Sequence, residues 1–252
     1  MKLSAIYVNY RSSYYLQQSL LLLLASLKNI SSEIYVIDNN SWDQRLTTLQ
    51  QTYPKVQFLR NTHNVGFAKA SNIALRRCKG DYVLLLNPDV YVQPETLSSM
   101  LHYMNQHSVI GILAPQLRFQ NGSLQYSCRR YPTPLVHFLK MIYPRARQVQ
   151  HYLMKDIDHS SPRDIDWSLG AFLLVRREVL DKIGFLDERF FLYFEDVDLC
   201  RRAKRAGWRV VYYPKAVATH LYQQSSHRYF SKPFFHHLMS MYRYYRKYGV
   251  RP

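Results

Sequence analysis

Cysteine is scarce in this sequence, which excludes two kinds of cross-linked protein. Only Cys78, Cys128 and Cys200 occur among 252 residues, and no two of them form a C-x-x-C pair. An odd number of widely spaced cysteines indicates neither a disulfide framework nor a thiolate zinc site. We therefore expect a protein of a reducing compartment such as the cytoplasm.

Long apolar runs are also missing. The run at 20–25 is six residues long, whereas a membrane-spanning helix needs roughly 20. The first residues include one lysine and then a strand-like pattern, without the apolar region and cleavage site of a secretory signal. We expect the protein to stay inside the cell.

Glycine-rich phosphate loops are absent as well. No G-x-G-x-x-G follows the first apolar run, and no G-x-x-x-x-G-K-[ST] occurs anywhere in the chain. These absences argue against a dinucleotide site and a P-loop, so any phosphates must be held in another way.

Acidic residues are half as numerous as basic ones. The chain has 17 Asp and Glu against 34 Lys and Arg, a formal charge of +17. Such an excess indicates an anionic partner: nucleic acid, an acidic membrane face or a phosphorylated substrate.

Apolar, β-rich runs alternate with helix-like stretches in the first half of the chain. The predicted strands cover 3–8, 34–37, 56–59 and 82–86, and the predicted helices between them cover 14–27, 42–52 and 67–78. This alternation is typical of βαβ units, and the lack of period-2 patterning indicates a sheet with helices on both faces. Polar clusters follow the strands, at the carboxyl ends where such sheets bind ligands.

The second half is less regular. We predict a helix at 94–107, a strand at 109–113 and a turn at Asn121-Gly122. Residues 129–166 are basic and aromatic, and we interpret prolines 132, 134, 144 and 162 as breaks in an irregular excursion. A strand at 171–175, a helix at 195–206 and strands at 209–212 and 216–219 then return to the core.

Asn87-Pro88-Asp89 directly follows a fully apolar predicted strand. A hard divalent ion binds through one or two carboxylates plus substrate phosphates, and this turn supplies one such carboxylate. The alternative is an Asx turn that caps the helix after Pro94.

Glu195, Asp196 and Asp198 open a predicted helix, where acidic side chains interact favourably with the helix dipole. Asp198 lies one turn before Arg201 and Arg202 and can pair with either. Asp196 projects about 160° away from Asp198 around a helix with 3.6 residues per turn. This direction leaves Asp196 available for catalysis.

Six short motifs occur in order along the chain. They are Val8-Asn9-Tyr10, Asp38-Asn39-Asn40-Ser41, Asn64-Val65-Gly66-Phe67, Asn87-Pro88-Asp89, Trp167-Ser168-Leu169-Gly170-Ala171-Phe172 and Phe194-Glu195-Asp196-Val197-Asp198. With them the chain resembles the inverting family 2 glycosyltransferases, especially the rhamnosyltransferase-like group, over residues 2–225. The resemblance implies a GT-A fold with a mixed, mostly parallel α/β sheet, a nucleoside-diphosphate sugar donor, and Mg or Mn.

The resemblance assigns the donor site to residues near the predicted strand ends. These are Val8, Asn9, Tyr10, Asp38, Asn40, Asn64, Gly66, Phe67, Asn87 and Asp89. In the family the acidic residue after the second strand contacts the donor base, so Asp38 would accept the N3–H of thymine or uracil. The alternative is that Asp38 caps the helix beginning near Trp42, for which Ser41 is also a candidate.

The segment from Asn64 to Phe67 forms a predicted tight turn before a helix. Gly66 can adopt positive φ there, so that backbone amides face the donor. An ordinary loop before a core helix is the alternative.

The metal motif of the family is usually D-x-D, whereas this chain has Asn87 in the first position. The resemblance therefore leaves Asp89 as the main metal ligand and offers His220 as a second one. An imidazole ligand would favour Mn over Mg. The chain has ten histidines, so a structural role for His220 is the alternative.

The resemblance also implies the catalytic roles. Asp196 is the expected general base that deprotonates the acceptor hydroxyl, with Glu195 in a supporting role. The acceptor would contact Trp167, Gly170, Ala171 and Glu195. A core position is the alternative for Trp167.

Residues 226–252 predict a basic, aromatic, amphipathic helix, with Phe234, Leu238, Met241 and Tyr245 along one face. Such a helix either binds an anionic membrane surface or packs on its own domain. We accordingly divide the chain into a GT-A domain at 1–225, with a nucleotide-sugar half at 1–115 and an acceptor half at 116–225, and a helix at 226–252.

The predicted function is inverting transfer of a sugar in cell-surface polysaccharide synthesis. By resemblance the donor is dTDP-rhamnose and the acceptor a polyprenyl-diphosphate-linked saccharide, handled on the inner face of the cytoplasmic membrane. Alternatives are another UDP- or dTDP-hexose donor and, from another class, a nucleic-acid-binding protein, for which no known motif occurs. A nucleotidyltransferase and an inactive transferase are weaker rivals.

Overall fold

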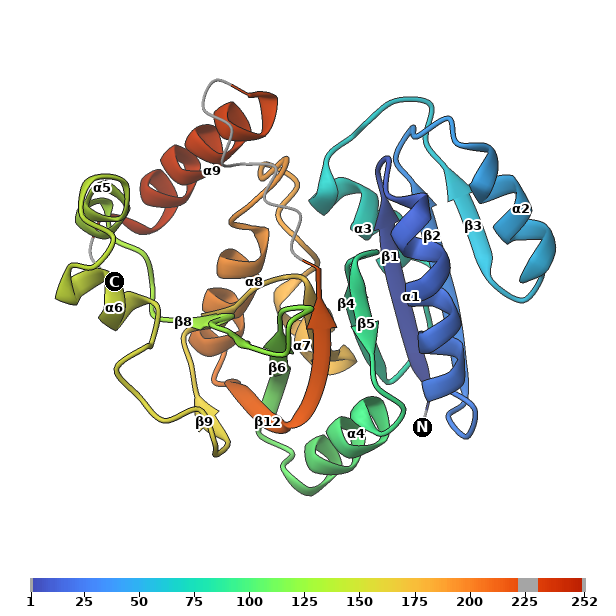
Figure 1. Ribbon diagram of the computed structural model, residues 1–252, viewed down its shortest axis with the longest axis horizontal. Helices are drawn as coiled ribbons and strands as arrows, with labels where there is room; N and C mark the ends of the chain where they lie inside the picture. Colours follow the sequence, from blue (N-terminus) through green and yellow to red (C-terminus); the bar gives the residue numbers. More distant parts are fainter. Residues whose placement is uncertain (1, 222–230, 251–252) are drawn as a thin grey trace.

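A computed structural model describes residues 2–221 and 231–250, arranged around a mixed sheet (Figure 1). The strands are β1 (Leu3–Asn9), β2 (Ser32–Asp38), β3 (Gln57–Arg60), β4 (Tyr82–Leu86), β5 (Val90–Val92), β6 (Ile110–Arg118), β7 (Leu124–Gln125), β8 (Cys128–Arg129), β9 (Arg163–Asp164), β10 (Trp167–Ser168), β11 (Phe172–Arg176) and β12 (Arg209–His220). The helices are α1 (Ser13–Ser26), α2 (Gln44–Thr52), α3 (Phe67–Leu75), α4 (Thr96–Gln106), α5 (Pro134–Ile142), α6 (Arg147–Tyr152), α7 (Arg177–Ile183), α8 (Glu195–Arg205) and α9 (Lys232–Tyr248). The main sheet has the order β3-β2-β1-β4-β11-β6-β12-β5, with β7 beside β6 and β9 beside β12, while β8 and β10 pair separately.

Helices cover both faces of this sheet, which explains why the strands lack period-2 patterning. Every residue of β1 is buried. Its Leu3, Ala5 and Tyr7 share a hydrophobic cluster with residues of α1, α2 and α4, whereas Ile6 and Val8 share a second cluster with residues of α3, α7 and α8. Each strand in the centre of the sheet therefore needs apolar side chains on both sides.

Four strands lie side by side and run parallel, in the order β3, β2, β1, β4. Asn9 at the end of β1 is in register with Asp38 at the end of β2, which is in register with Arg60 at the end of β3. On the other side of β1, Tyr7 is in register with Leu86, the last residue of β4. The polar clusters therefore meet at one edge of the sheet.

The prediction of an irregular excursion at 129–166 is wrong, because this segment contains α5 and α6. Thr133 caps α5 by accepting a hydrogen bond from the Val136 N–H (3.2 Å), and Pro134 lies in its first turn. A proline at that position loses no helical hydrogen bond and has a suitable φ. The pair Thr133-Pro134 is thus a helix start that we interpreted as a break.

The C-terminal helix α9 lies beside α5 at the end of the molecule opposite α1 and α2 (Figure 1). One of its faces packs on the catalytic region, with Tyr244 fully buried and accepting a hydrogen bond from Arg201 (2.8 Å). Packing on its own domain was one of our two alternatives, and an exposed face remains. The division at 225/226 falls outside the described residues.

Among the residues that the structure describes, no helix has the length and apolarity required to cross a membrane.

Candidate active site

The carboxyl end of β2 presents Asp38, which is 7% exposed and accepts a hydrogen bond from the Ser41 N–H (3.0 Å). The side chain of Asn9 donates to Ser41 Oγ (3.0 Å), which ties β1 to the same turn. Both helix-cap alternatives, Asp38 and Ser41, are wrong. Helix α2 begins later, at Gln44, and Asp43 caps it.

Asn39 joins this edge to the next loop, and we missed it. Its Oδ1 accepts from the Val65 N–H (3.0 Å) and its Nδ2 donates to Asn64 Oδ1 (2.7 Å), which also accepts from the Gly66 N–H (3.0 Å). The only signal in the sequence is its place in a polar run, because its partners lie about 25 residues away.

Gly66 has a φ of +86°, as its predicted turn requires. A Cβ at this position would lie 2.6 Å from the carbonyl oxygen of Phe191. That carbonyl accepts the N–H of Phe67 at 2.7 Å, so the loop before α8 fastens the first turn of α3. Glycine is needed here both for its φ and for this close approach.

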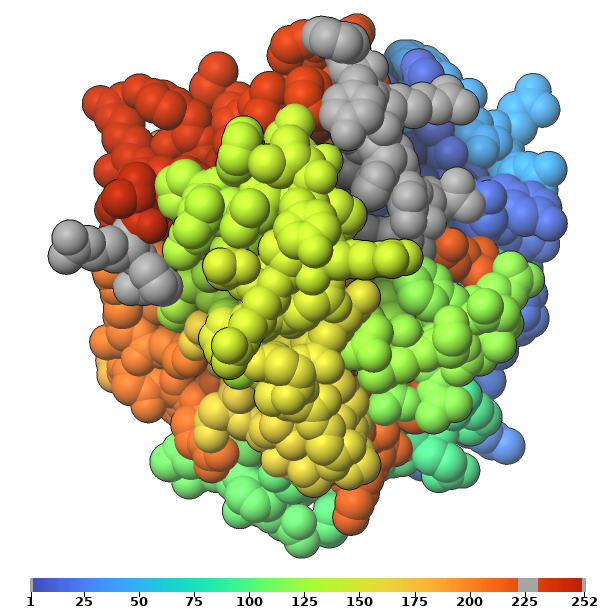
Figure 2. All heavy atoms as spheres, turned by 60° about the vertical axis from the view of Figure 1, so that its left-hand side comes forward, coloured from blue at the N-terminus to red at the C-terminus, as the bar shows by residue number. Residues whose placement is uncertain are grey.

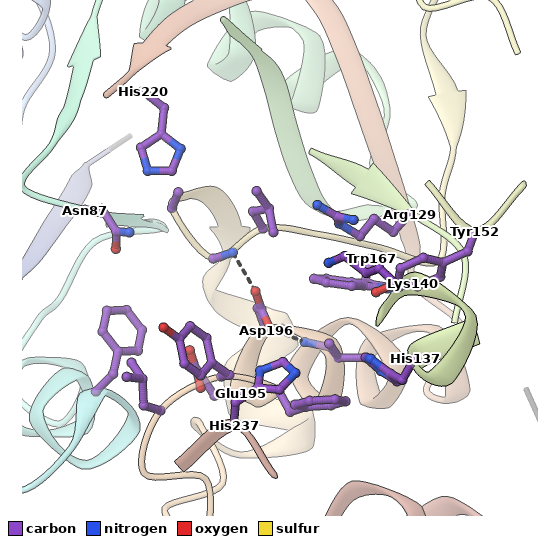
Figure 3. Close-up of a pocket in the computed structure, with 18 of the residues that line it drawn as sticks. Asn87, Arg129, His137, Lys140, Tyr152, Trp167, Glu195, Asp196, His220 and His237 are labelled. Atoms are coloured by element: carbon purple, nitrogen blue, oxygen red, sulfur yellow. Dashed lines mark hydrogen bonds between the residues drawn. The ribbon is translucent and has the colours of Figure 1, made fainter. Parts of the chain in front are cut away.

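A pocket of about 320 Å³ opens beside this edge (Figure 3). The predicted residues that line it are Phe67, Asn87, Asp89, Trp167, Gly170, Ala171, Glu195, Asp196 and His220. The predicted donor residues outside its lining are Val8, Asn9, Tyr10, Asp38, Asn40, Asn64 and Gly66. The structure therefore gathers the metal, catalytic and acceptor candidates in one cavity and leaves most donor candidates on the adjoining edge.

Asp89 and His220 face each other in this pocket. The Leu221 N–H donates to the Asp89 carbonyl (3.0 Å), and His220 Nε2 lies 3.5 Å from Asp89 Oδ1. His220 Nδ1 lies 2.8 Å from Gln125 Oε1, so Gln125 can hold the imidazole with Nε2 facing the carboxylate. The alternative that Asp89 caps the following helix is wrong, because α4 starts after Glu95.

Asp89 and His220 suit a divalent ion that takes only a few of its ligands from the protein. An imidazole nitrogen and a carboxylate oxygen face each other at 3.5 Å, and both side chains are largely buried. No cluster of three or more His, Cys, Asp or Glu suited to a metal occurs in the described residues. Substrate phosphates and water can supply further ligands, as is usual for Mg and Mn in nucleotide sites.

Asp196 is held by two backbone donors. Its Oδ2 accepts from the Gly170 N–H and its Oδ1 from the Val197 N–H, both at 2.8 Å. Asp198 turns away as predicted: it is fully buried and binds Arg202 (2.7 Å) together with Lys247 (2.5 Å). The two aspartates of one helical turn therefore have separate surroundings.

A strained turn delivers this pair of acids to the pocket. Tyr193 and Phe194, immediately before α8, both have positive φ, 68° and 69°. Bulky residues adopt this conformation only when surrounding structure enforces it, and such strain concentrates at functional sites. The ring of Phe194 packs between His237 and Tyr244, which holds the turn in place.

Glu195 and Asp196 differ in protonation. Burial, and then the negative charge of Asp196, raise the pKa of Glu195 well above its ordinary value. Burial also raises the pKa of Asp196, but its two backbone donors and the charge of Arg129 oppose that rise. The pKa of Glu195 is therefore raised more than that of Asp196, which favours the proton on Glu195 and makes Asp196 the better candidate for a general base.

The far side of the pocket is basic, and sequence reasoning missed it. We call Arg129, His137, Lys140 and His237 the basic wall; they come from β8, α5 and α9 (Figure 3). Trp167 is 6% exposed and lies under the Arg129 guanidinium, so it is both a core residue and part of the lining. The one signal was the basic, aromatic character of 129–147.

A family model described as glycosyltransferase like family 2 matches residues 2–234. The chain belongs to glycosyltransferase family 2. The N-acetylglucosaminyl-diphospho-decaprenol L-rhamnosyltransferase of Mycobacterium tuberculosis is 31% identical over 234 residues, covering 86% of this chain and 75% of that protein. The rhamnosyltransferase WbbL of Escherichia coli K12 is 31% identical over 187 residues, covering 71% and 69%.

Solved structures agree on the fold of this family 2 glycosyltransferase. The mannosyltransferase PcManGT from Pyrobaculum calidifontis, in complex with GDP-Man and Mn2+, has a TM-score of 0.66 at 17% identity and covers 99% of this chain. Residues 1–349 of S. aureus TarS give a TM-score of 0.61 at 19% identity over 87% of this chain, which spans 60% of that fragment. The predicted GT-A-type α/β fold and the predicted glycosyltransferase activity are confirmed.

Proposed function

We propose that this family 2 glycosyltransferase transfers L-rhamnose from dTDP-rhamnose, with inversion, to N-acetylglucosamine on a polyprenyl diphosphate. Two relatives at 31% identity are rhamnosyltransferases, and one of them is named for such an acceptor. The observation that carries the reaction type is the Asp196 carboxyl group, fixed by the N–H groups of Gly170 and Val197 in the pocket that also contains Asp89 and His220.

The donor base binds at the carboxyl ends of β1 and β2. Asp38 accepts the N3–H of thymine or uracil with the carboxylate that the Ser41 N–H already orients. Asn39, Asn64 and Gly66 shape the neighbouring turn through hydrogen bonds to one another and to the Val65 N–H.

The donor diphosphate lies toward Asn87, Asp89 and His220. Asp89 and His220 hold Mg or Mn there, and the imidazole favours Mn. The ion, when bound, supplies positive charge that stabilises the leaving diphosphate.

Asp196 then acts as the general base. The acceptor oxygen attacks the anomeric carbon from the face opposite the diphosphate and loses its proton to the Asp196 carboxylate, while the bond to the diphosphate breaks. The N–H groups of Gly170 and Val197 keep that carboxylate in one orientation. Protonated Glu195 remains neutral and can donate a hydrogen bond to the acceptor.

A panel of nucleotide sugars tests this proposal. With Mn or Mg and a diphosphate-linked N-acetylglucosamine acceptor, we expect nucleotide release and sugar transfer to be fastest from dTDP-rhamnose. Faster transfer from another dTDP- or UDP-hexose would replace the donor and leave the reaction type intact. Salt-dependent RNA binding with no nucleotide-sugar turnover would contradict the proposal altogether.

The exposed faces of α5 and α9 fit an anionic membrane surface. We call these side chains the apolar rim: Leu135, Phe138, Met141, Ile142, Phe235, Met239 and Tyr242, each at least 50% exposed. Figure 2 shows α5 in yellow-green next to α9 in red on this face. Residues 96–155 and 199–252, which include both helices, contain no Asp or Glu, so the charge around the rim complements anionic lipid.

Vesicle sedimentation tests the membrane role. We expect the chain to sediment with vesicles that contain anionic lipid and the Phe138→Ser, Met141→Ser double variant to remain in the supernatant. Leu21→Ser, which removes an exposed leucine from α1, is the matched control. Equal sedimentation of all three chains would contradict membrane binding through the apolar rim.

A further inference from the structure

Two cations of the basic wall, Arg129 and Lys140, form no ion pair with a described residue. In the described part of the chain, no carboxylate lies within ion-pair distance of Arg129 or Lys140. Most other acids of the acceptor half are paired, for example Asp166 with Lys204 (2.6 Å) and Asp164 with Arg209 (2.7 Å). The pocket therefore concentrates positive charge on one side of Asp196.

Arg129 is the most firmly placed of these cations. It is 9% exposed, and its guanidinium lies 5.6 Å from the ring centres of Tyr152 and Trp167. Its buried Nε has no hydrogen-bond partner among the described residues. Burying a guanidinium without a carboxylate is costly, and an anion bound in the pocket would offset that cost.

Helix α5 contributes the neighbouring groups. His137 and Lys140 line the pocket, and His237 of α9 approaches His137 with a ring-centre distance of 5.9 Å. Desolvation in the pocket and the positive charge of Arg129 lower the pKa of Lys140, although this side chain is still exposed to solvent. Burial and nearby basic groups lower the pKa values of His137 and His237 to about 3 and 4. The histidines are thus neutral hydrogen-bonding groups, and the buried Nε2 of His137 has no partner among the described residues.

Arg129, His137 and Lys140 of the basic wall lie on the opposite side of Asp196 from His220, which with Asp89 forms the candidate metal pair. In Figure 3, Asn87 and His220 are on one side of Asp196, and Arg129, Lys140 and His137 are on the other. A second anion bound at the basic wall would therefore approach the base from the side away from the donor diphosphate. This is the side from which an acceptor must enter for inversion.

The two faces of α5 match an amphiphilic acceptor. His137 and Lys140 line the pocket, whereas Leu135, Phe138 and Met141 are exposed on the outer face. A phosphate group in the pocket and an alkyl chain along the outer face would both find complementary surroundings on one helix of nine residues.

We propose that Arg129, Lys140 and His137 form a subsite for the diphosphate of the acceptor, separate from the donor diphosphate site at Asp89 and His220. The proposal rests on the proposed function, because it requires an acceptor with a diphosphate. With such a subsite, the enzyme would select its acceptor by the diphosphate as well as by the sugar.

Two soluble acceptors test the subsite: a short-alkyl diphosphate of N-acetylglucosamine and the alkyl glycoside of the same sugar without phosphate. We expect the unmodified chain to prefer the diphosphate acceptor. We measure the preference as the ratio of kcat/KM for the diphosphate acceptor to kcat/KM for the glycoside. Lys140→Gln should lower this ratio about tenfold by raising the KM of the diphosphate acceptor, and Arg129→Gln should lower it further. Lys155→Gln removes the same charge outside the pocket and should keep the original preference.

Three results would count against the subsite. Equal losses with both acceptors in Lys140→Gln would mean that the wall binds the sugar or supports the fold, and the proposed function would stand. A preference unchanged in both wall variants would overturn the subsite alone. Failure of the unmodified chain to use either acceptor would overturn the proposed function and the subsite together.

Discussion

The donor edge and the acceptor side of the pocket hold their polar groups in different ways. At the donor edge, Asn39, Asn64 and the N–H groups of Val65 and Gly66 bond to one another. On the acceptor side, Glu195 Oε2, His137 Nε2 and Arg129 Nε are buried without partners among the described residues. The residues of the donor edge thus bond mainly to one another, although Asn9 Oδ1 and Asn40 Oδ1 are also buried without partners among the described residues. On the acceptor side the unpaired atoms belong to an acid, an imidazole and a guanidinium, which a substrate can engage.

Removing the charge of Asp196 should separate the two sides most clearly. Asp196→Asn keeps the size of the side chain but cannot accept a proton, so we expect kcat to fall about 10²–10⁴-fold. The Kd of the nucleotide sugar, measured by calorimetry, should change less than twofold. Asp181→Asn, on the exposed surface of α7, is the control. An Asp196→Asn chain with normal turnover would show that the acceptor side does not contain the base.

The metal pair connects the two sides, and its loss should have the next largest effect. We expect His220→Ala to raise the Mn concentration for half-maximal activity about 100-fold, and Gln125→Ala, which removes only the support of the imidazole, about tenfold. The exposed His102→Ala serves as the control. An unchanged Mn titration in His220→Ala would leave Asp89 as the sole protein ligand.

The close packing of the donor edge can be tested at Gly66. Gly66 and Gly122 both have positive φ, but a Cβ would contact protein atoms only at Gly66. Gly122→Ala should therefore cost about 1 kcal/mol of unfolding free energy from φ alone, and Gly66→Ala about 1–2 kcal/mol more from the overlap with Phe191. Urea unfolding measures the unfolding free energy of both variants. Equal decreases in the two variants would show that the loop moves to accommodate the new methyl group at residue 66.

The raised pKa of Glu195 should produce the smallest effect, a change in stability that depends on pH. A raised pKa means that the native state binds more protons than the unfolded chain above the ordinary glutamate value of 4.5, so the unfolding free energy falls as pH rises through this window. Glu195→Gln removes this fall. We expect its melting temperature to exceed that of the unmodified chain by about 3 °C at pH 8 and to equal it at pH 4.

The exposed Glu178→Gln should show no such pH dependence. A Glu195→Gln chain that melts no higher at pH 8 would indicate that Glu195 is ionised in the native state.

The two sides also differed in how far the sequence predicted them. Apart from β5, which we did not predict, the strands and helices of residues 1–115 followed from apolar runs and short connections, and even the positive φ of Gly66 followed from its turn. The basic wall did not, because His137 and His237 are 100 positions apart and meet only through the packing of α5 and α9. Local patterns cannot report such contacts.

The strained turn before α8 was equally inaccessible to prediction. Nothing in the residue types of Tyr193 and Phe194 favours positive φ. Their conformation is imposed by aromatic packing from α9. By contrast, the opposite directions of Asp196 and Asp198 followed from helical geometry alone, and the structure confirms them.

The contacts of Asp198 give the molecule an order of assembly. Its buried carboxylate is neutralised by Arg202 of its own helix and by Lys247 of α9, and it accepts a hydrogen bond from Tyr248 of α9. On the ribosome, the nucleotide-binding strands are made first, and α8 emerges some 40 residues before its partners in α9. A nascent chain could thus form the donor edge early, but the helix that carries the base would gain its full set of ionic partners only after α9 had been translated and docked.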